Sequence, residues 1–173
     1  ELHVITTHPN RYANLRVVAD DLEVDGKITV HRIAVPVHQS GMLSQARSFA
    51  VYAVSAYSLS RRINPNFLIG TTGRLMTGML TGITAYTLSI RYFIDLRDIF
   101  SETMSDLFSR KNRLLGLIAK KLFSFIDRRL LSNAAGVNVV SEGFPEYFES
   151  IGVNTAIWSF FPNGVDKEFV GLG

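Results

Sequence analysis

The hydrophobic positions along the chain follow two alternating patterns: short apolar runs, and longer segments in which apolar residues recur every three or four positions. The short runs are rich in β-branched and aromatic residues and predict strands. They cover residues 2–7, 28–35, 67–72, 91–96, 136–141 and 154–161. The longer segments predict helices over residues 41–62, 74–88 and 110–131. We therefore expect an α/β fold with a Rossmann-like, doubly wound, mostly parallel sheet and helices on both faces.

Several element boundaries carry their own signals. Pro65 ends the helical pattern of residues 41–62. Residues 8–27 form a polar stretch between the first two strands and end in a turn at Asp25 and Gly26. The most apolar long window, residues 75–94, is rich in Thr and Gly and contains Arg91, so it predicts a buried helix followed by a strand and not a membrane span.

Composition narrows the class of protein without naming a reaction. The 173 residues are 47% hydrophobic and 19% charged, as expected for one packed domain. The absence of cysteine excludes disulfides, thiolate metal sites and a cysteine nucleophile. The four histidines lack metal-ligand spacing, and His3 and His31 lie inside predicted strands, where we expect structural roles. No nucleotide-binding loop or hydrolase motif occurs in the sequence.

Polar residues follow several of the predicted strands, at the edge of a parallel sheet where ligands usually bind. They are His8 after the first strand, Thr72 after the third, Arg97, Asp98 and Glu102 after the fourth, and Ser141 and Glu142 after the fifth. Each has a structural alternative. Thr72 or Ser141 can cap the following helix, with Glu142 near the positive end of its dipole, and His8 can be an exposed loop residue.

The residues after the fourth strand are the strongest candidates. Asp95, Arg97 and Asp98 place three charges within four residues, directly behind an apolar strand. Such charges are costly to bury unless they are paired or functional. The structural alternative is an internal ion pair of Arg97.

Residues 110–131 are strongly basic, with seven of the eighteen Lys and Arg of the chain and a single acid, Asp127. On a helix, one face is apolar: Leu114, Leu115, Ile118, Leu122, Phe125 and Ile126. The other is basic: Arg110, Arg113, Lys120, Lys121 and Arg128. Such a helix can pack on the sheet, rest on an anionic membrane, or do both if the apolar face packs inward and the charges face lipid head groups. Nucleic acid is not an expected partner, because no recognition motif accompanies the charges.

Five segments in this order resemble the amino-terminal domain of family-4 glycosyltransferases of GT-B fold, in particular the bacterial branch that builds lipopolysaccharide, capsule and O-antigen. They read ELHVITTHPN, INPNFLIGTT, RYFIDLRDIFSET, AAGVNVVSEGF and FFPNGVDKEF, and together they cover nearly the whole chain. DLRDIFSET is similar to the D-x-R-D-hydrophobic-W/F-P-E motif of that branch, and VNVVSEGF to its A-D-x-V-x-V-V-S-E-x-F motif.

The resemblance implies a two-domain enzyme with its active site in the cleft between the domains. Residues 1–173 would be the acceptor-side domain, without its first strand and glycine-rich loop and without the donor-side domain. The implied reaction is retaining transfer from a nucleotide-sugar donor to a glycan or lipid-linked acceptor, with no metal or other cofactor. The implied location is the cytoplasm, peripheral at the inner face of the cytoplasmic membrane. This domain alone is expected to be inactive.

The resemblance also suggests roles for individual residues. Arg97 and Asp98 fall where many members have a His-Asp pair at the cleft, which makes them the catalytic candidates. The strand-end residues His8, Thr72, Glu102, Ser141 and Glu142 become candidates for substrate binding. The turn of Asn163, Gly164 and Asp166 falls where the family has its interdomain hinge. An alternative from a different class is a stand-alone α/β module that binds a small ligand or regulates a partner, and the rest of the open reading frame distinguishes the two.

Overall fold

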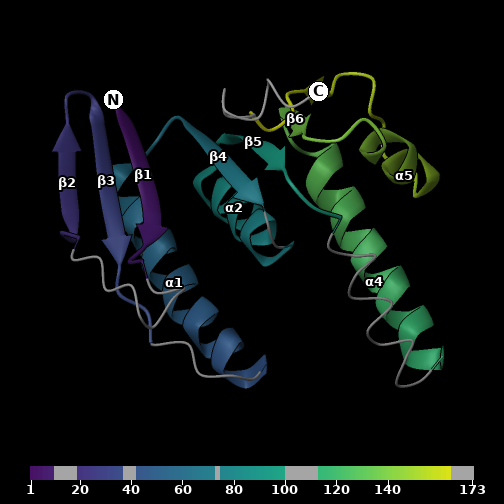
Figure 1. Ribbon diagram of the computed structural model, residues 1–173, viewed down its shortest axis with the longest axis horizontal. Helices are drawn as coiled ribbons and strands as arrows, with labels where there is room; N and C mark the ends of the chain where they lie inside the picture. Colours follow the sequence, from purple (N-terminus) through teal and green to yellow (C-terminus); the bar gives the residue numbers. More distant parts are fainter. Residues whose placement is uncertain (10–18, 37–41, 73–74, 100–112, 165–173) are drawn as a thin grey trace, which may run out of the picture. The chain divides into compact units, whose positions relative to one another are not determined.

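The computed structural model describes residues 1–9, 19–36, 42–72, 75–99 and 113–164 (Figure 1). The chain divides into two compact units, Glu1–Asn64 (unit 1) and Pro65–Gly173 (unit 2). The described strands form two sheets, one in each unit. The mixed α/β class expected from the alternating pattern is confirmed, and the four-stranded sheet of unit 2 is entirely parallel, as in Rossmann-like folds.

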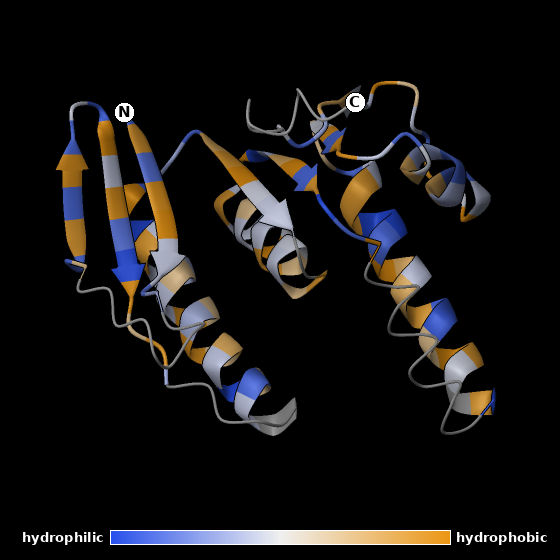
Figure 2. Ribbon diagram, viewed as in Figure 1, coloured by the Kyte–Doolittle hydropathy of each residue, from blue (hydrophilic) through white to orange (hydrophobic). Residues whose placement is uncertain are grey.

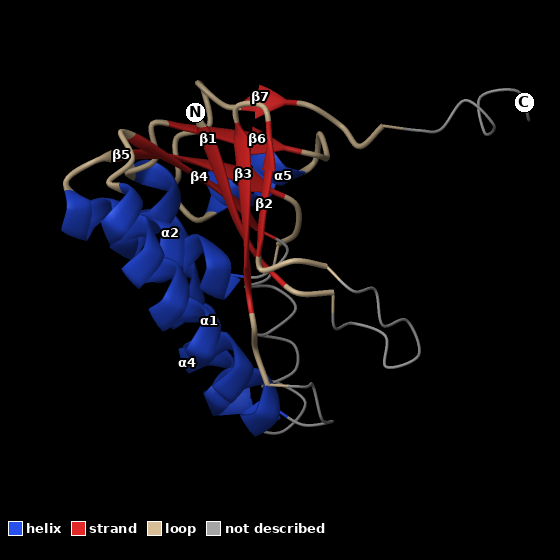
Figure 3. Ribbon diagram, turned by 90° about the vertical axis from the view of Figure 1, so that its left-hand side faces the viewer, coloured by secondary structure: helices blue, strands red, loops and turns tan. Residues whose placement is uncertain are grey.

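Unit 1 contains a three-stranded sheet and one long helix. Its elements are β1 (Leu2–Thr7), β2 (Leu22–Asp25), β3 (Ile28–Ile33) and α1 (Met42–Ile63). The strand order is β1-β3-β2, with β1 and β3 parallel and β2 antiparallel to β3 (Figure 3). Gly26, at a φ of +59°, makes the tight turn of the β2–β3 hairpin at the predicted position. Strand β2 itself was missed, since all four of its residues are exposed and carry no burial pattern.

Polar contacts connect the elements of unit 1. The Tyr52 hydroxyl on α1 donates a hydrogen bond to the carbonyl of Ile5 on β1, and burial raises the pKa of this phenol. His3 on β1 and His31 on β3 stack with ring centroids 5.3 Å apart, and His3 Nδ1 lies 3.0 Å from His31 Nε2. The two histidines that we expected to be structural therefore contact each other.

Unit 2 repeats the strand–helix pattern along one parallel sheet. Its elements are β4 (Phe67–Thr72), α2 (Leu75–Leu88), β5 (Arg91–Leu96), α4 (Arg113–Ser132), β6 (Gly136–Val139), α5 (Phe144–Ser150) and β7 (Ser159–Phe160). The strand order β4-β5-β6-β7 follows the chain. Each step between neighbouring strands requires a crossover, and helices α2, α4 and α5 provide these connections (Figure 1). Strand β7 is shorter than residues 154–161, because a turn at its start is closed by the bond from Trp158 N to Thr155 O.

The core of unit 2 lies where β5 and β6 meet the helices. Its most buried large side chains are Ile94, Val137, Val139 and Phe148. The Tyr92 hydroxyl on β5 donates to the carbonyl of Leu130 on α4 at 2.5 Å, and burial raises the pKa of this phenol. These contacts hold α4 against the central strand of the sheet.

Glycines allow the close approaches within unit 2. A Cβ added at Gly70 on β4 would lie 2.9 Å from the Cβ of Thr81 on α2. A Cβ at Gly78 or Gly82 on α2 would lie 2.7 or 2.9 Å from the methyl groups of Leu130 on α4. Helix α2 therefore packs on a strand and on a second helix through its small residues.

The orientation of α4 differs from the one expected from its sequence. Leu114, Ile118, Leu122 and Phe125 were assigned to a face packed inward, but each is between 53% and 65% exposed. Of the residues assigned to that face, Ile126 does pack against the core. The other residues of α4 on the packed side are Gly116, Ala119, Phe123, Asp127 and Leu130. The packed side is shifted from the predicted one, and Leu130 on it fits against Gly78 and Gly82 of α2, where a side chain on α2 would collide with it.

Candidate functional site

The carboxyl ends of β4 and β5 bring together the strongest candidates in the sequence. These strands pair in parallel, with Thr71 opposite Asp95 and Thr72 opposite Leu96. The pairing continues one residue beyond β5, where the Arg97 amide donates to the Thr72 carbonyl at 3.1 Å. Thr72 is buried, and its hydroxyl donates to the carbonyl of Asp95 at 3.4 Å. Thr72 thus supports the strand ends through its side chain.

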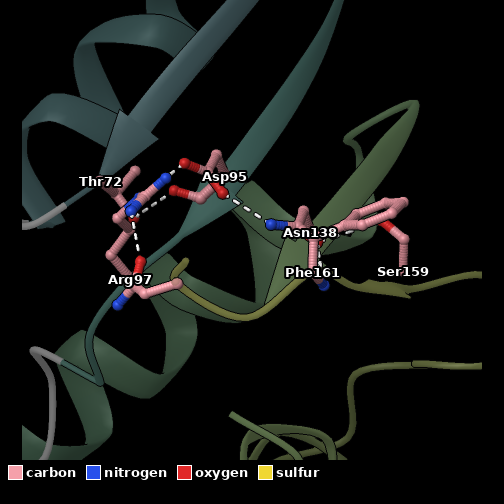
Figure 4. Close-up of polar contacts among 7 residues, drawn as sticks. Thr72, Asp95, Arg97, Asn138, Ser159 and Phe161 are labelled. Carbon is pink, nitrogen blue, oxygen red and sulfur yellow. Dashed lines mark hydrogen bonds and ion pairs between the residues drawn. The ribbon is translucent and has the colours of Figure 1, made fainter. Parts of the chain in front are cut away.

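Four side chains form a hydrogen-bonded cluster at this edge, which we call the strand-end network: Asp95, Arg97, Asn138 and Asn163. Figure 4 labels the first three of them. The Asp95 carboxylate accepts from Arg97 Nε at 2.8 Å and from Asn138 Nδ2 at 2.7 Å. Arg97 Nη1 in turn donates to Asn163 Oδ1 at 2.7 Å. The network therefore joins β5, β6 and the turn that follows β7.

Asn138 also connects the network to the end of β7, through the oxygen of its side-chain amide. Its Oδ1 accepts from the backbone amide of Phe161 at 2.9 Å and lies 3.5 Å from the Ser159 hydroxyl (Figure 4). Asn138 is buried, so its amide must find partners inside the protein. The amide nitrogen of Asn138 bonds Asp95, and its amide oxygen bonds the Phe161 backbone. The segment Phe161–Asn163 is therefore held against the sheet at its first and last residues, by Asn138 and by Arg97.

The ion pair of the network is partly open to solvent. The Asp95 side chain is 14% exposed and that of Arg97 is 47% exposed. At that exposure the attraction between the two charges contributes about 0–1 kcal/mol, so the main effect is to orient the guanidinium. Among the described residues, Arg97 donates to Asp95 through Nε and to Asn163 through Nη1, and a guanidinium has five N–H donors in total. With respect to these residues, the group retains donors that a phosphate or carboxylate could meet.

Asp98 lies next to the network in sequence and is exposed. It borders a hollow that is otherwise lined mainly by apolar residues, including Leu75, Leu96, Leu130 and Phe148. The hollow has a volume of about 10 Å³, enough for one water molecule. A ligand of Asp98 would have to bind outside this hollow.

The other predicted site residues have separate surroundings. Ser141 and Glu142 are exposed after β6, and neither caps α5, because its N-cap is Gly143, with no side-chain cap bond. His8 belongs to unit 1, where its Nε2 lies 2.7 Å from Asp21 Oδ1. Of the predicted hinge residues, Asn163 joins the network and Gly164 is exposed. Glu102, Asp166 and Arg110 lie outside the described residues.

Sequence reasoning missed the part played by Asn138. A polar residue inside the apolar run GVNVV was the available signal, because a buried amide requires nearby partners. Asp95 was recognised as part of the charge cluster, but its partner across the sheet could not be known without the register of β5 and β6. In that register Asp95 lies directly opposite Asn138.

Within the described part of the chain, no group of three or more His, Asp or Glu side chains could hold a metal ion. Nor is any helix among these residues both long and apolar enough to cross a membrane. In comparisons with known proteins, no family model and no curated protein matches this chain. The site is therefore defined by its geometry: a polar network at the carboxyl edge of a parallel sheet.

Proposed function

We propose that residues 1–173 form the amino-terminal, acceptor-side domain of a GT-B glycosyltransferase, which transfers a sugar from a nucleotide-sugar donor to a glycan or lipid-linked acceptor in cell-surface polysaccharide synthesis. The observation that carries the proposal is the strand-end network. It fastens the turn before Gly164 to the edge of the parallel sheet where α/β proteins bind their ligands. The resemblance of FFPNGVDKEF to the segment that leads into the GT-B hinge supports the same function.

In this proposal Arg97 and Asp98 have different tasks. Arg97 is primarily a positioning residue, because it orients Asn163 and is itself oriented by Asp95. Its remaining donors face the acceptor or a phosphate. Asp98, which is exposed at the mouth of the hollow, contacts an acceptor hydroxyl. No metal is needed for either task.

Substitution of Asp98 in the protein encoded by the whole gene tests the proposal. Asp98→Asn keeps the shape of the side chain and removes its charge, so turnover should fall at least about tenfold, or about 1.4 kcal/mol in the barrier. The unfolding midpoint should change little, since Asp98 is exposed. The matched control is Asp25→Asn, an exposed carboxylate in the β2–β3 hairpin, which should keep full activity.

Two results would contradict the proposal. Normal turnover of Asp98→Asn would show that Asp98 does not contact the acceptor. Failure of the unmodified protein to transfer sugar from UDP- or GDP-linked donors to a lipid-linked acceptor, together with a stop codon soon after residue 173, would favour the stand-alone module.

A further inference from the structure

A cavity in unit 2 lies at the opposite edge of the sheet from the strand-end network. It is lined by residues at the end of α4, at the start of β6 and in the turn that precedes β7. Because β6 and β7 are parallel, these segments meet at the amino-terminal edge of the sheet. Figure 2 shows a hydrophobic stretch near the end of α4, where the chain turns toward β6. The cavity has a volume of about 170 Å³, whereas the hollow beside Asp98 has about 10 Å³.

The walls of this cavity are mostly apolar, and an aromatic ring is among them. Leu131 and Val137 are buried and form its inner side. Trp158 and Ile157 line it from the turn before β7. Trp158 packs on Phe148, with ring centroids 5.4 Å apart, and this contact holds the indole in place. Ile157 is 72% exposed, so a ligand in the cavity would cover apolar surface that now faces solvent.

Two polar side chains stand at the mouth of the cavity. Ser132 and Asn154 line it, and both are exposed. Asn154 Oδ1 accepts from the Ala156 amide at 3.0 Å and so helps to close the turn. Within the described part of the chain, neither Nδ2 of Asn154 nor the Ser132 hydroxyl has a hydrogen-bond partner. They therefore offer an amide nitrogen and a hydroxyl to a ligand.

The absence of charge around the cavity selects a neutral ligand. Among the described residues that line it, none is Asp, Glu, Lys, Arg or His. A charged group that entered the cavity would lose its water without gaining a partner of opposite charge. A sugar ring is also poorly matched, because its many hydroxyls would meet only the two polar side chains at the mouth.

We propose that this cavity binds a neutral aromatic ring that carries one hydrogen-bonding substituent. An apolar cavity of about 150 Å³ holds one benzene ring, so about 170 Å³ admits a single ring and little more. The ring contacts Leu131, Ile157 and Trp158, and its substituent bonds Ser132 or Asn154. The site lies at the other edge of the sheet from the strand-end network, so it is independent of the proposed function.

Titration of the 173-residue chain with benzyl alcohol, followed by fluorescence of Trp158, tests the proposal. Trp158 is the only tryptophan of the chain and lines the cavity, so its emission reports an occupant directly. Benzyl alcohol should bind in a saturable manner with a dissociation constant of about 1 mM, as expected for so small a ligand. Benzoate, which has the same ring and a negative charge, should bind at least about tenfold more weakly. Methyl glucoside should leave the emission unchanged.

Two substitutions in the cavity wall locate the binding. Ile157→Ala removes an exposed part of the wall, and Ala134→Leu adds atoms at a position that lines the cavity, so each should weaken benzyl alcohol binding at least about fivefold. Ile83→Ala is the matched control, because Ile83 is also exposed, at 56%, but lies on α2 and is not among the residues that line the cavity. It should bind benzyl alcohol as the unmodified chain does. The urea midpoint of each variant verifies that unit 2 is folded.

Three outcomes would overturn the proposal. They are an emission that does not saturate with benzyl alcohol, binding of methyl glucoside as tight as that of benzyl alcohol, and equal affinities of Ile157→Ala, Ala134→Leu and Ile83→Ala for benzyl alcohol. The first would mean that the cavity holds only solvent, the second that it is a sugar site, and the third that the ring binds elsewhere on the chain.

Discussion

Asp95 is the residue on which the strand-end network depends, because its two oxygens serve different partners. One accepts from Arg97 and the other from Asn138, so the carboxylate fixes a flexible cation and a buried amide together. The structural alternative for the charge cluster, an ion pair of Arg97, is therefore confirmed. Asp98 stands apart from that pair, and its role as a substrate contact stays a prediction.

The buried amide of Asn138 gives a test of the network. Asn138→Asp keeps the acceptor for the Phe161 amide, but it removes the donor to Asp95 and places a second carboxylate 2.7 Å from the first. We expect unit 2 to lose about 1–3 kcal/mol at neutral pH. The proton shared by two close carboxylates is held more tightly in the folded state, so part of this loss should be regained as the pH falls.

Urea unfolding followed by Trp158 fluorescence measures this effect, since the tryptophan packs on Phe148 in unit 2. Asn154→Asp is the control, because Asn154 is exposed and its Oδ1 accepts from the Ala156 amide, which an aspartate can also do. Equal stability of Asn138→Asp and the unmodified chain at neutral pH would mean that the network is not a stabilising element.

The His3–His31 contact predicts that unit 1 is sensitive to acid. Burial, and secondarily the charge of His3, lowers the pKa of His31 from its ordinary value of 6.5. The unfolded chain then binds this proton more readily than the folded one. Stability should be full above about pH 6.5 and should decline as the pH falls below that value. Glu1, 3.6 Å from His3, is the carboxylate that faces the pair.

Hydrogen exchange of the β3 amides across this pH range, corrected for intrinsic rates, measures the decline. His31→Gln should make it smaller. His8→Gln should leave it unchanged, because His8 bonds Asp21 and not the pair. Constant protection of β3 between about pH 7.5 and pH 5.5 would show that the imidazoles do not control unit 1.

At the scale of elements, the contact between β4 and α2 depends on the absence of a side chain at Gly70. An added methyl group would overlap Thr81, whose Cβ would be only 2.9 Å away. We expect Gly70→Ala to destabilise unit 2 by about 1–3 kcal/mol, because a helix and a strand must separate to make room. Thr81→Ala in the same chain should recover part of the loss.

Gly143→Ala provides the control for this substitution. A Cβ at Gly143 meets nothing within 4 Å, and its φ of −79° suits any residue. The urea midpoint of Gly143→Ala, followed by Trp158 fluorescence, should match that of the unmodified chain. If Gly70→Ala matched it as well, the close approach of β4 and α2 would not be required for stability.

The elements also show which features a sequence can predict. Residues 67–72 and 91–96 form strands with the predicted bounds, because a short apolar run between polar residues has few alternatives. Strand β2 could not be recognised, because it pairs with β3 while all its side chains stay exposed. The packed face predicted for α4 was right for Ile126 and wrong for Leu114, Ile118, Leu122 and Phe125, because the buried side depends on tertiary contacts such as that of Leu130 with the glycines of α2.

For the candidate site, the sequence located the edge of the sheet but not the partners. Arg97 and Asn163 were both singled out, yet 66 positions separate them, and only the fold places them 2.7 Å apart. Asn138 was overlooked, because its partner Asp95 becomes its neighbour only through the register of β5 and β6. Long-range pairing of this kind is not encoded in local pattern.

At the scale of the whole molecule, the strand-end edge contains polar groups suited to positioning but little preformed space for a nucleotide. Arg97 and Asn138 are bonded within the network, and the hollow beside Asp98 holds about one water molecule. The sequence also lacks a glycine-rich phosphate loop. Bonded polar groups and little space for a nucleotide are what we expect of an acceptor-side domain whose partner domain holds most of the donor.

We therefore expect residues 1–173 to bind UDP- and GDP-sugars with dissociation constants no tighter than about 1 mM, or about 4 kcal/mol of binding free energy. Isothermal titration calorimetry measures this directly, and Arg97→Gln shows whether any binding uses the strand-end network. Positioning two substrates supplies a large share of the rate in group transfer, so weak donor binding by this chain is compatible with an efficient complete enzyme. A low-micromolar dissociation constant that Arg97→Gln abolishes would instead make the strand-end edge a nucleotide site in its own right, and the stand-alone binding module would replace the acceptor-side domain.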